Sequence, residues 1–126
     1  MSSSIKGVIM NNKIKIKVSD LIGSQLCISV EDGQKVFDKV DQLVKDGNHV
    51  TISFENVTML ISVFLNVAIG QLYGSFSEEA IRTQLKVEGL SSDDMTLVKS
   101  VVDNAKKYYL NKKSYDEAWL EDDDNE

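Results

Sequence analysis

Ser62 is the residue with the strongest physical case for chemistry, because it stands near the start of an apolar stretch from Leu60 to Leu72. The stretch is about 13 residues long, against the roughly 20 that a bilayer crossing needs, so it predicts a helix packed into a protein core. If the helix begins at Ser62, a phosphate on the hydroxyl would meet free backbone N–H groups and the positive end of the helix dipole. The alternative is that Ser62 only caps the helix, which would contribute about 0.5–2 kcal/mol.

Asn66 and Tyr73 follow Ser62 at offsets of 4 and 11, and with Gly70 they fall on one helical stripe. We expect Asn66 and Tyr73 to satisfy polar groups at the exposed edge of the helix, and Gly70 to allow close helix packing. The turn before the helix, residues 58–62, is the part that packing does not explain. The residues predicted to contact a partner are therefore Thr58, Met59, Ser62 and Asn66.

Other reactive residue types lack the neighbours that chemistry would need. His49 begins a predicted strand without a second metal ligand at useful spacing, and Cys27 has no histidine near it in the sequence. There is no glycine-rich phosphate loop, no Ser-x-x-Lys motif and no paired set of cysteines or histidines. We therefore predict a non-enzymatic protein with no catalytic residues, no metal site and no cofactor, in which Cys27 is a buried, inert thiol.

Composition and charge restrict the partners. The 126 residues suit one globular domain, with 42% hydrophobic and 27% charged residues. The net charge of −6 comes from the C-terminus, because residues 116–126 hold seven acids and no base. Arg82 is the sole arginine, which argues against a nucleic-acid partner. The N-terminus lacks the apolar run of a signal peptide and nothing indicates a membrane partner, so the cytoplasm is the expected compartment.

Periodicity predicts the elements that must position Ser62. A β-hairpin comes first, with Asn11–Asn12 as the turn between residues 5–10 and an alternating strand at 13–18. A short extended piece at 26–28 precedes a helix that Ser29 caps and that ends at Asp46–Gly47.

Further strands are predicted at 50–54 and 85–88, on either side of the Ser62 helix and of a short helix that begins at Ser77. Ser91 or Ser92 caps a final long helix, whose predicted apolar face is formed by Met95, Val98, Val101, Val102, Ala105, Tyr108 and Tyr109.

The alternation of the strands indicates that helices cover only one face of the sheet, since a parallel sheet covered on both faces has continuously apolar strands. The predicted fold is a two-layer α/β sandwich with a mixed sheet of four or five strands over residues 1–112. Residues 113–126 are expected to form a C-terminal turn and an acidic tail that is disordered beyond Leu120. The predicted open face carries Lys13, Lys15, Lys17, Thr51, Ser53, Lys86 and Glu88. It is either a solvated surface or a weak anion-attracting patch.

Two stretches resemble STAS domains, the fold of anti-sigma factor antagonists and of sulfate-transporter tails. They are Leu21-Ile22-Gly23 with Ser29-Val30-Glu31-Asp32-Gly33, and Val50-Thr51-Ile52-Ser53-Phe54-Glu55-Asn56-Val57 with Ile61-Ser62-Val63-Phe64-Leu65. The resemblance covers roughly residues 13–110. More specifically, the chain resembles a small bacterial STAS-like family of uncharacterised function.

The resemblance implies a role for Ser62. In anti-sigma factor antagonists a serine at this helix start is phosphorylated by an ATPase-fold kinase that is also the binding partner. Here Ile61 takes the place of the aspartate that precedes this serine in the family, and Phe64 that of a glycine.

Two functions from different classes follow. The first is a STAS-like regulatory module that binds a protein, by resemblance a histidine-kinase-like ATPase or an anti-sigma-type protein, and that phosphorylation of Ser62 switches; a homodimer is left open. The alternative is a small-molecule or nucleotide sensor that uses the same helix N-terminus as an anion site.

Overall fold

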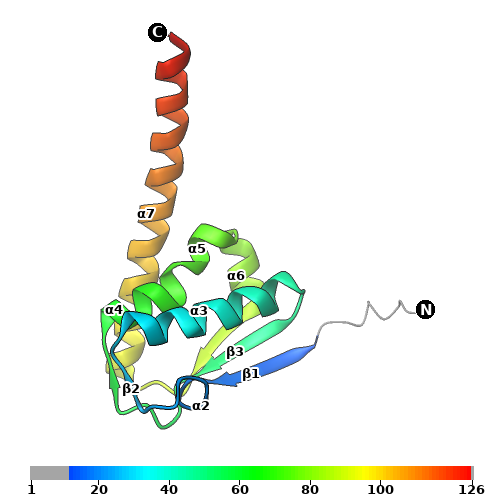
Figure 1. Ribbon diagram of the computed structural model, residues 1–126, viewed down its shortest axis with the longest axis vertical. Coiled ribbons are helices and arrows are strands. Elements are labelled where there is room, and N and C mark those ends of the chain that lie inside the picture. The colour runs from blue at the N-terminus through cyan, green and yellow to red at the C-terminus, as the bar shows by residue number, and fades with distance from the viewer. Residues whose placement is uncertain (1–11, 126) are drawn as a thin grey trace, which may run out of the picture.

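The computed structural model describes residues 12–125, with side chains from 12 to 112. Three parallel strands lie in the order β1 (Lys13–Lys17), β3 (His49–Ser53) and β5 (Leu85–Glu88). Helix α3 (Val30–Lys45) connects β1 to β3, and its ribbon lies across the sheet in Figure 1. A helical crossover of this kind is what joins neighbouring parallel strands.

The two shortest strands form a sheet of their own. β2 (Leu26–Cys27) pairs in parallel with β4 (Met59–Leu60). The prediction of one mixed sheet is therefore not confirmed: the described residues form five strands in two sheets, and these strands pair in parallel. Both strands end after two residues because the chain turns into a helix shortly after each of them. The predicted antiparallel strand at 5–10 lies outside the described residues.

Serine caps set the starts of three helices, and the sequence predicts those formed by Ser29 and Ser91 as caps, whereas it predicts Ser77 only as the start of its helix. The hydroxyl of Ser29 accepts a hydrogen bond from Asp32 N at 3.1 Å at the start of α3. Ser77 receives one from Ala80 N at the start of α6 (Glu78–Gln84), also at 3.1 Å. Ser91 does the same for Asp94 N at 3.1 Å, just before α7 (Ser92–Asn125). Each bond satisfies a backbone donor that the helix itself leaves free.

The predicted helix after Leu60 is divided. It consists of α4 (Ser62–Leu65), the π-helix η1 (Asn66–Gly70) and α5 (Leu72–Ser75). Earlier in the chain, between the predicted strand at 13–18 and the extended piece at 26–28, lies α2 (Val18–Ile22), which ends at the left-handed Gly23 with φ +70°. None of the described helices combines the length and apolarity that a bilayer crossing requires.

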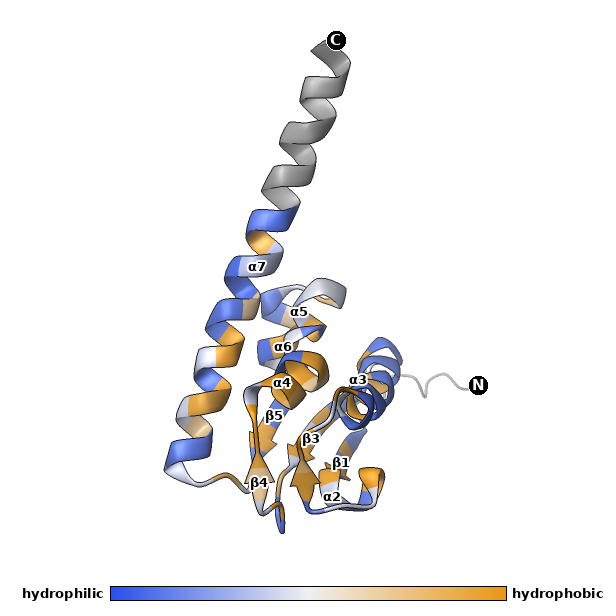
Figure 2. Ribbon diagram, turned by 60° about the vertical axis from the view of Figure 1, so that its left-hand side comes forward, coloured by the Kyte–Doolittle hydropathy of each residue, from blue (hydrophilic) through white to orange (hydrophobic). Residues whose placement is uncertain are grey.

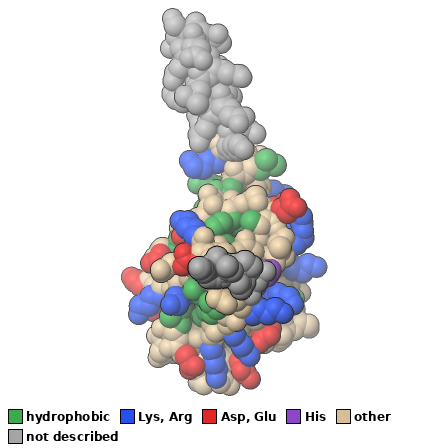
Figure 3. Space-filling view, turned by 90° about the vertical axis from the view of Figure 1, so that its right-hand side faces the viewer, with side chains coloured by type: hydrophobic (Ala, Val, Ile, Leu, Met, Phe, Trp, Pro, Cys, Tyr) green, Lys and Arg blue, Asp and Glu red, His purple; other side chains and the backbone are tan. Residues whose placement is uncertain are grey.

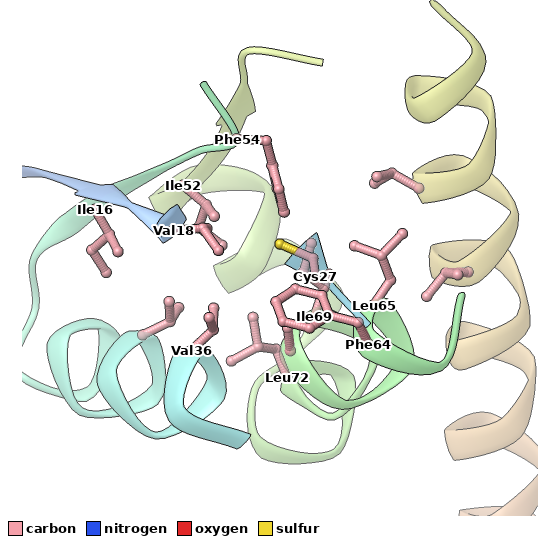
Figure 4. Close-up of a cluster of buried hydrophobic side chains, with 14 of the residues drawn as sticks. Ile16, Val18, Cys27, Val36, Ile52, Phe54, Phe64, Leu65, Ile69 and Leu72 are labelled. Atoms are coloured by element: carbon pink, nitrogen blue, oxygen red, sulfur yellow. The ribbon is translucent and has the colours of Figure 1, made fainter. Parts of the chain in front are cut away.

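The core lies between the sheet and the helices. Figure 4 shows side chains from β1, β3, α3 and the α4–α5 segment pointing toward one another. The largest side chains that are almost fully buried are Phe54, Phe64, Ile52, Leu65, Ile69 and Leu72. The apolar stretch of the sequence is thus a core element, as its composition predicts.

The open face of the sheet matches the prediction at most positions. Lys13, Lys15, Lys86 and Glu88 are exposed there. Ser53 is the exception, because only 1% of it is accessible. Its short side chain stands on the central strand between the longer Lys17 and Glu88, its partners in register, and its hydroxyl accepts from Glu55 N at 3.3 Å.

Helix α7 buries only part of its predicted apolar face. Val98, Val101 and Ala105 are buried, whereas Met95 is 39% and Tyr108 is 58% exposed. Figure 1 shows that α7 extends beyond the other helices. The backbone continues as one helix to Asn125, and the division of the chain after residue 112 stays a prediction.

Candidate partner-binding surface

The candidate site is built by two segments that run side by side at the carboxyl ends of β1 and β3. Leu26 stands opposite Met59, and Cys27 stands opposite Leu60. The backbone of Gln25 accepts from Thr58 N at 2.8 Å and from the Thr58 hydroxyl at 3.3 Å. At the other end, Ile61 N donates to Cys27 O at 3.2 Å. These bonds fix how the two segments lie against each other.

Alternation along these segments turns one row of side chains inward and the other outward. Cys27 and Leu60 are buried in the core, at 0% and 9% exposure. Their neighbours along the extended chain, Leu26, Ile28, Met59 and Ile61, point away from the core, since successive side chains in extended chain alternate. Val30 and Val63 are exposed at the starts of α3 and α4. The outward set consists of Leu26 (43% exposed), Ile28 (41%), Val30 (51%), Met59 (52%), Ile61 (37%) and Val63 (48%). We call these six residues the apolar patch.

Figure 2 shows hydrophobic colouring along β4 and along the chain that leads from it into α4. None of its six side chains is charged. Single exposed apolar residues are common on proteins, but a contiguous set of this kind marks interaction surfaces.

Close packing of α3 against α4 and η1 brings together the two halves of the apolar patch, which lie in residues 26–30 and 59–63. Gly33, in the first turn of α3, has no side chain at the point where α4 and η1 pass. A Cβ there would lie 2.9 Å from Phe64 O and 3.0 Å from the Val67 Cβ. The missing side chain lets the starts of α3 and α4 lie next to each other, and these starts carry Val30 and Val63.

Ser62 is the first residue of α4 and is not its cap. The cap position belongs to Ile61, whose side chain accepts no hydrogen bond, so the alternative of Ser62 as the N-cap is wrong. The extended backbone of Ile61 (φ −123°, ψ 161°) moves the cap one residue earlier than the sequence suggests. Ser62 is exposed, beside Ile61 and Val63 of the apolar patch. Because the cap residue is apolar, its side chain cannot accept hydrogen bonds from the first backbone N–H groups of the helix.

The structure brings together some of the other predicted contact residues. Met59 lies in the apolar patch, and Thr58 is exposed beside it while it bonds to Gln25 O. Asn66 is exposed but belongs to a hollow of about 260 Å³ against α7, together with Tyr108 and Tyr109. Its carbonyl accepts from Gln71 N at 3.1 Å, the wide turn of a π-helix. Asn66 thus faces α7 more than it faces the apolar patch.

The single stripe predicted for Ser62, Asn66, Gly70 and Tyr73 is broken by the same π turn. Gly70 is buried against α7, but a Cβ there would lie at an ordinary 3.6 Å from the Ala105 Cβ, so the expectation that glycine allows close packing here is not confirmed. Tyr73 is half-buried, and burial raises the pKa of its hydroxyl. A π turn adds a residue, so the α-helical spacing of the stripe no longer holds beyond it.

The remaining reactive groups are inert or structural. Cys27 is buried, as predicted. Burial, and secondarily the negative charge of Asp32, raises the pKa of its thiol to about 11, which favours the protonated form. Lys106 Nζ lies 2.8 Å from Glu78 Oε2, and this hydrogen-bonded pairing lowers the pKa of Glu78 and raises that of Lys106. In the described part of the chain, no three His, Cys, Asp or Glu side chains gather as a set of metal ligands.

A comparison with protein families decides what kind of domain this is. The family model described as a STAS-like domain of unknown function (DUF4325) matches residues 32–95, about half of the chain. The chain belongs to this STAS-like family. The match supports the resemblance seen in the sequence and the α/β architecture, and it assigns no activity. No curated protein and no solved structure matches the chain significantly.

The family match contains one half of the apolar patch of this STAS-like domain. Residues 32–95 include Met59, Ile61 and Val63 but not Leu26, Ile28 and Val30. The second half is therefore supplied by a part of the chain that the family model does not cover.

Sequence reasoning missed five of the six residues of the apolar patch and found only Met59. The signal that could have found them is the pair of short apolar runs Leu26-Cys27-Ile28 and Met59-Leu60-Ile61. A strand that is apolar on both sides must be covered on both sides or must expose one of them. In the described part of the chain, the outer side chains of these runs stay exposed.

Proposed function

We propose that this STAS-like domain is a non-enzymatic regulatory module that binds another protein through the apolar patch. The observation that carries the proposal is the row of six exposed apolar side chains on two hydrogen-bonded segments. The centres of protein interfaces are depleted of charge and rich in such side chains, and Met is favoured among them. Backbone bonds hold the two segments, so the surface would lose little conformational freedom on binding.

The partner class comes from the resemblance. A histidine-kinase-like ATPase or an anti-sigma-type protein is the candidate, with an apolar surface that packs on the outward-facing side chains of β2 and β4. The finer part of the proposal is a switch: phosphorylation of Ser62 would place a dianion beside Ile61 and Val63 and oppose burial of the apolar patch. The family match does not bear on this switch.

The test is a calorimetric titration of the full chain with a purified ATPase of this class from the same organism. Met59→Lys and Val30→Lys each put a charge in the apolar patch at a side chain that is about half exposed, so both variants should fold. We expect each to weaken binding by about tenfold or more, since a central contact is worth above 1 kcal/mol. Leu110→Lys is the matched control, because Leu110 is 66% exposed on α7.

The outcomes separate the parts of the proposal. Equal binding by the wild type and by both variants of the apolar patch would contradict it. Self-association of the wild type that Met59→Lys abolishes, measured by sedimentation, would assign the apolar patch to a homodimer instead. Ser62→Asp should weaken binding while Ser62→Ala preserves it, and equal affinity of these two variants would remove the switch and leave the interaction.

The alternative sensor function uses the same helix start as an anion site. The side chains of the apolar patch supply no cation to hold such an anion. Thermal melts with a panel of nucleotides distinguish the two functions, because a ligand far above its dissociation constant raises the melting temperature.

A further inference from the structure

Strand register builds a grid of side chains on the open face of the three-stranded sheet. Lys13 pairs with His49, and Thr51 pairs with Lys86. Side chains two residues apart in a strand share a face, so these four stand on the same face as Lys15 and Glu88. Lys13 and His49 are the first residues of their strands, which places this group toward the amino ends of β1 and β3.

A hollow of about 320 Å³ opens among these side chains. Its lining consists of Lys13, His49, Val50, Thr51, Thr83, Gln84 and Lys86. The lining thus contains two ammonium groups, an imidazole and two hydroxyls, and none of these residues is acidic. Figure 3 shows the histidine side chain on this side of the molecule with Lys and Arg side chains gathered beside it.

The cations of the hollow have no internal partner. Neither Lys13 nor Lys86 forms an ion pair within the described part of the chain, and the imidazole of His49 has no hydrogen bond there. The neighbouring Lys15 differs, since its Nζ lies 2.9 Å from Glu88 Oε2. Of the three lysines on this face that form no ion pair in the described part of the chain, Lys13 and Lys86 line the hollow, and Lys17 stands at the other end of β1.

Hydrogen bonds hold in place the part of α6 that lines the hollow. Gln84 Nε2 donates to Asn48 O at 3.1 Å and to Val44 O at 3.4 Å. The Thr83 hydroxyl donates to Glu79 O at 2.9 Å. The two Gln84 bonds tie the end of α6 to the end of α3 and to the residue before β3, and the Thr83 bond lies within α6. The hollow therefore keeps its shape without a ligand.

We propose that this hollow binds the phosphate group of a small phosphorylated molecule. The two lysines, the imidazole and the Thr51 hydroxyl can all donate to phosphate oxygens, and a dianion would relieve the repulsion among the cations. The volume lies at the lower end of the roughly 300–1,000 Å³ typical of small-molecule sites. The hollow lies toward the opposite end of β3 from the apolar patch, so this proposal stands or falls independently of the protein-binding function.

His49 makes the test direct, because it is the single histidine of the chain. The full chain is titrated with inorganic phosphate and then with pyrophosphate at constant ionic strength, and the imidazole signals of His49 are followed by NMR. We expect a saturable shift with both anions and none with chloride. Lys13→Gln and Lys86→Gln should each weaken binding by about tenfold, the loss expected for one charge-assisted hydrogen bond.

Two variants serve as controls. Lys99→Gln removes an exposed lysine of α7 that forms no ion pair in the described chain, and it should leave the affinity unchanged. Lys86→Arg keeps the charge at the hollow and should retain binding. Melting temperatures verify that each variant folds, as the exposure of both lysines leads us to expect.

Three results would overturn the proposal. The first is the absence of a saturable His49 shift, and the second is equal weakening by Lys99→Gln, which would mean that only net charge matters. The third is binding of a single-stranded oligonucleotide without any response to pyrophosphate, which would make this face a nucleic-acid surface instead.

Discussion

Gly33 lies so close to the backbone of Phe64 that a Cβ on it would stand 2.9 Å from the Phe64 carbonyl oxygen. Real Cβ atoms essentially never approach a neighbour that closely, and the neighbour here is backbone, which cannot swing aside. The contact joins α3 to the α4–η1 segment, and so it sets the distance between the two halves of the apolar patch.

Gly33→Ala should therefore destabilise the protein, although alanine is the better helix former. The gain in helix propensity is about 1 kcal/mol, and overpacking costs typically about 1–3 kcal/mol. We expect a net loss of about 1 kcal/mol and a melting temperature lower by several degrees. Gly70→Ala is the matched control, because its Cβ would meet Ala105 at an ordinary 3.6 Å. A Gly33→Ala variant as stable as Gly70→Ala would show that the helices are not this close.

Ser62→Asp should weaken partner binding without lowering the stability of the protein. An acidic residue in the first turn of a helix stabilises it by about 0.3–1 kcal/mol, and salt screens the effect. Ser62 is the first residue of α4 and exposed, so the variant should melt at the same temperature as the wild type or slightly higher, with the gain lost in 1 M salt. A variant that both melts earlier and binds less would mean that its binding defect comes from unfolding.

Much of this fold follows from local patterns that the sequence displays. Alternation predicts β1, β3 and β5, and the serine caps of α3 and α7 and the start of α6 at Ser77 are predicted because capping depends only on neighbours in the chain. The arrangement of the strands in two sheets does not follow, since it depends on where β2 and β4 meet in space.

The candidate site could be predicted only in part. Ser62 and Met59 lie on the surface that the sequence indicates, but Leu26, Ile28 and Val30 join them through a pairing across more than thirty residues. The sequence pattern predicts that both sides of an apolar run are buried. It does not predict whether the protein itself or a partner buries them. The π turn at Asn66 is likewise invisible to an α-helical spacing rule.

Cys27 should make the protein less stable in alkali. Its thiol pKa in the folded state is about 11, above the ordinary value of 9.0, because the thiol is buried. The unfolded thiol ionises first, so the stabilisation is complete below pH 9 and is lost as the pH rises through 11. Two pKa units correspond to about 2–3 kcal/mol. Denaturant titrations from pH 8 to 11 should show a steeper loss for the wild type than for Cys27→Ala, and parallel curves would contradict this assignment.

Glu88 should control the strength of the phosphate site through Lys15. Lys15 stands in the same row of the sheet as Thr51 and Lys86, but its ammonium is turned to Glu88, and this pairing raises its pKa. Glu88→Gln removes the carboxylate and frees a third ammonium beside the hollow, so we expect phosphate to bind about two- to fivefold more tightly. The stability should change by less than about 1 kcal/mol, because both side chains of the pair are about half exposed.

The double variant Lys15→Gln/Glu88→Gln identifies the cause of that gain. It lacks the freed ammonium, so its affinity for phosphate should return to the wild-type value in the same His49 titration. If the double variant binds as tightly as Glu88→Gln alone, the gain comes from the loss of a nearby negative charge and Lys15 does not reach the anion. If Glu88→Gln binds no more tightly than the wild type, the ion pair does not restrain the site at all.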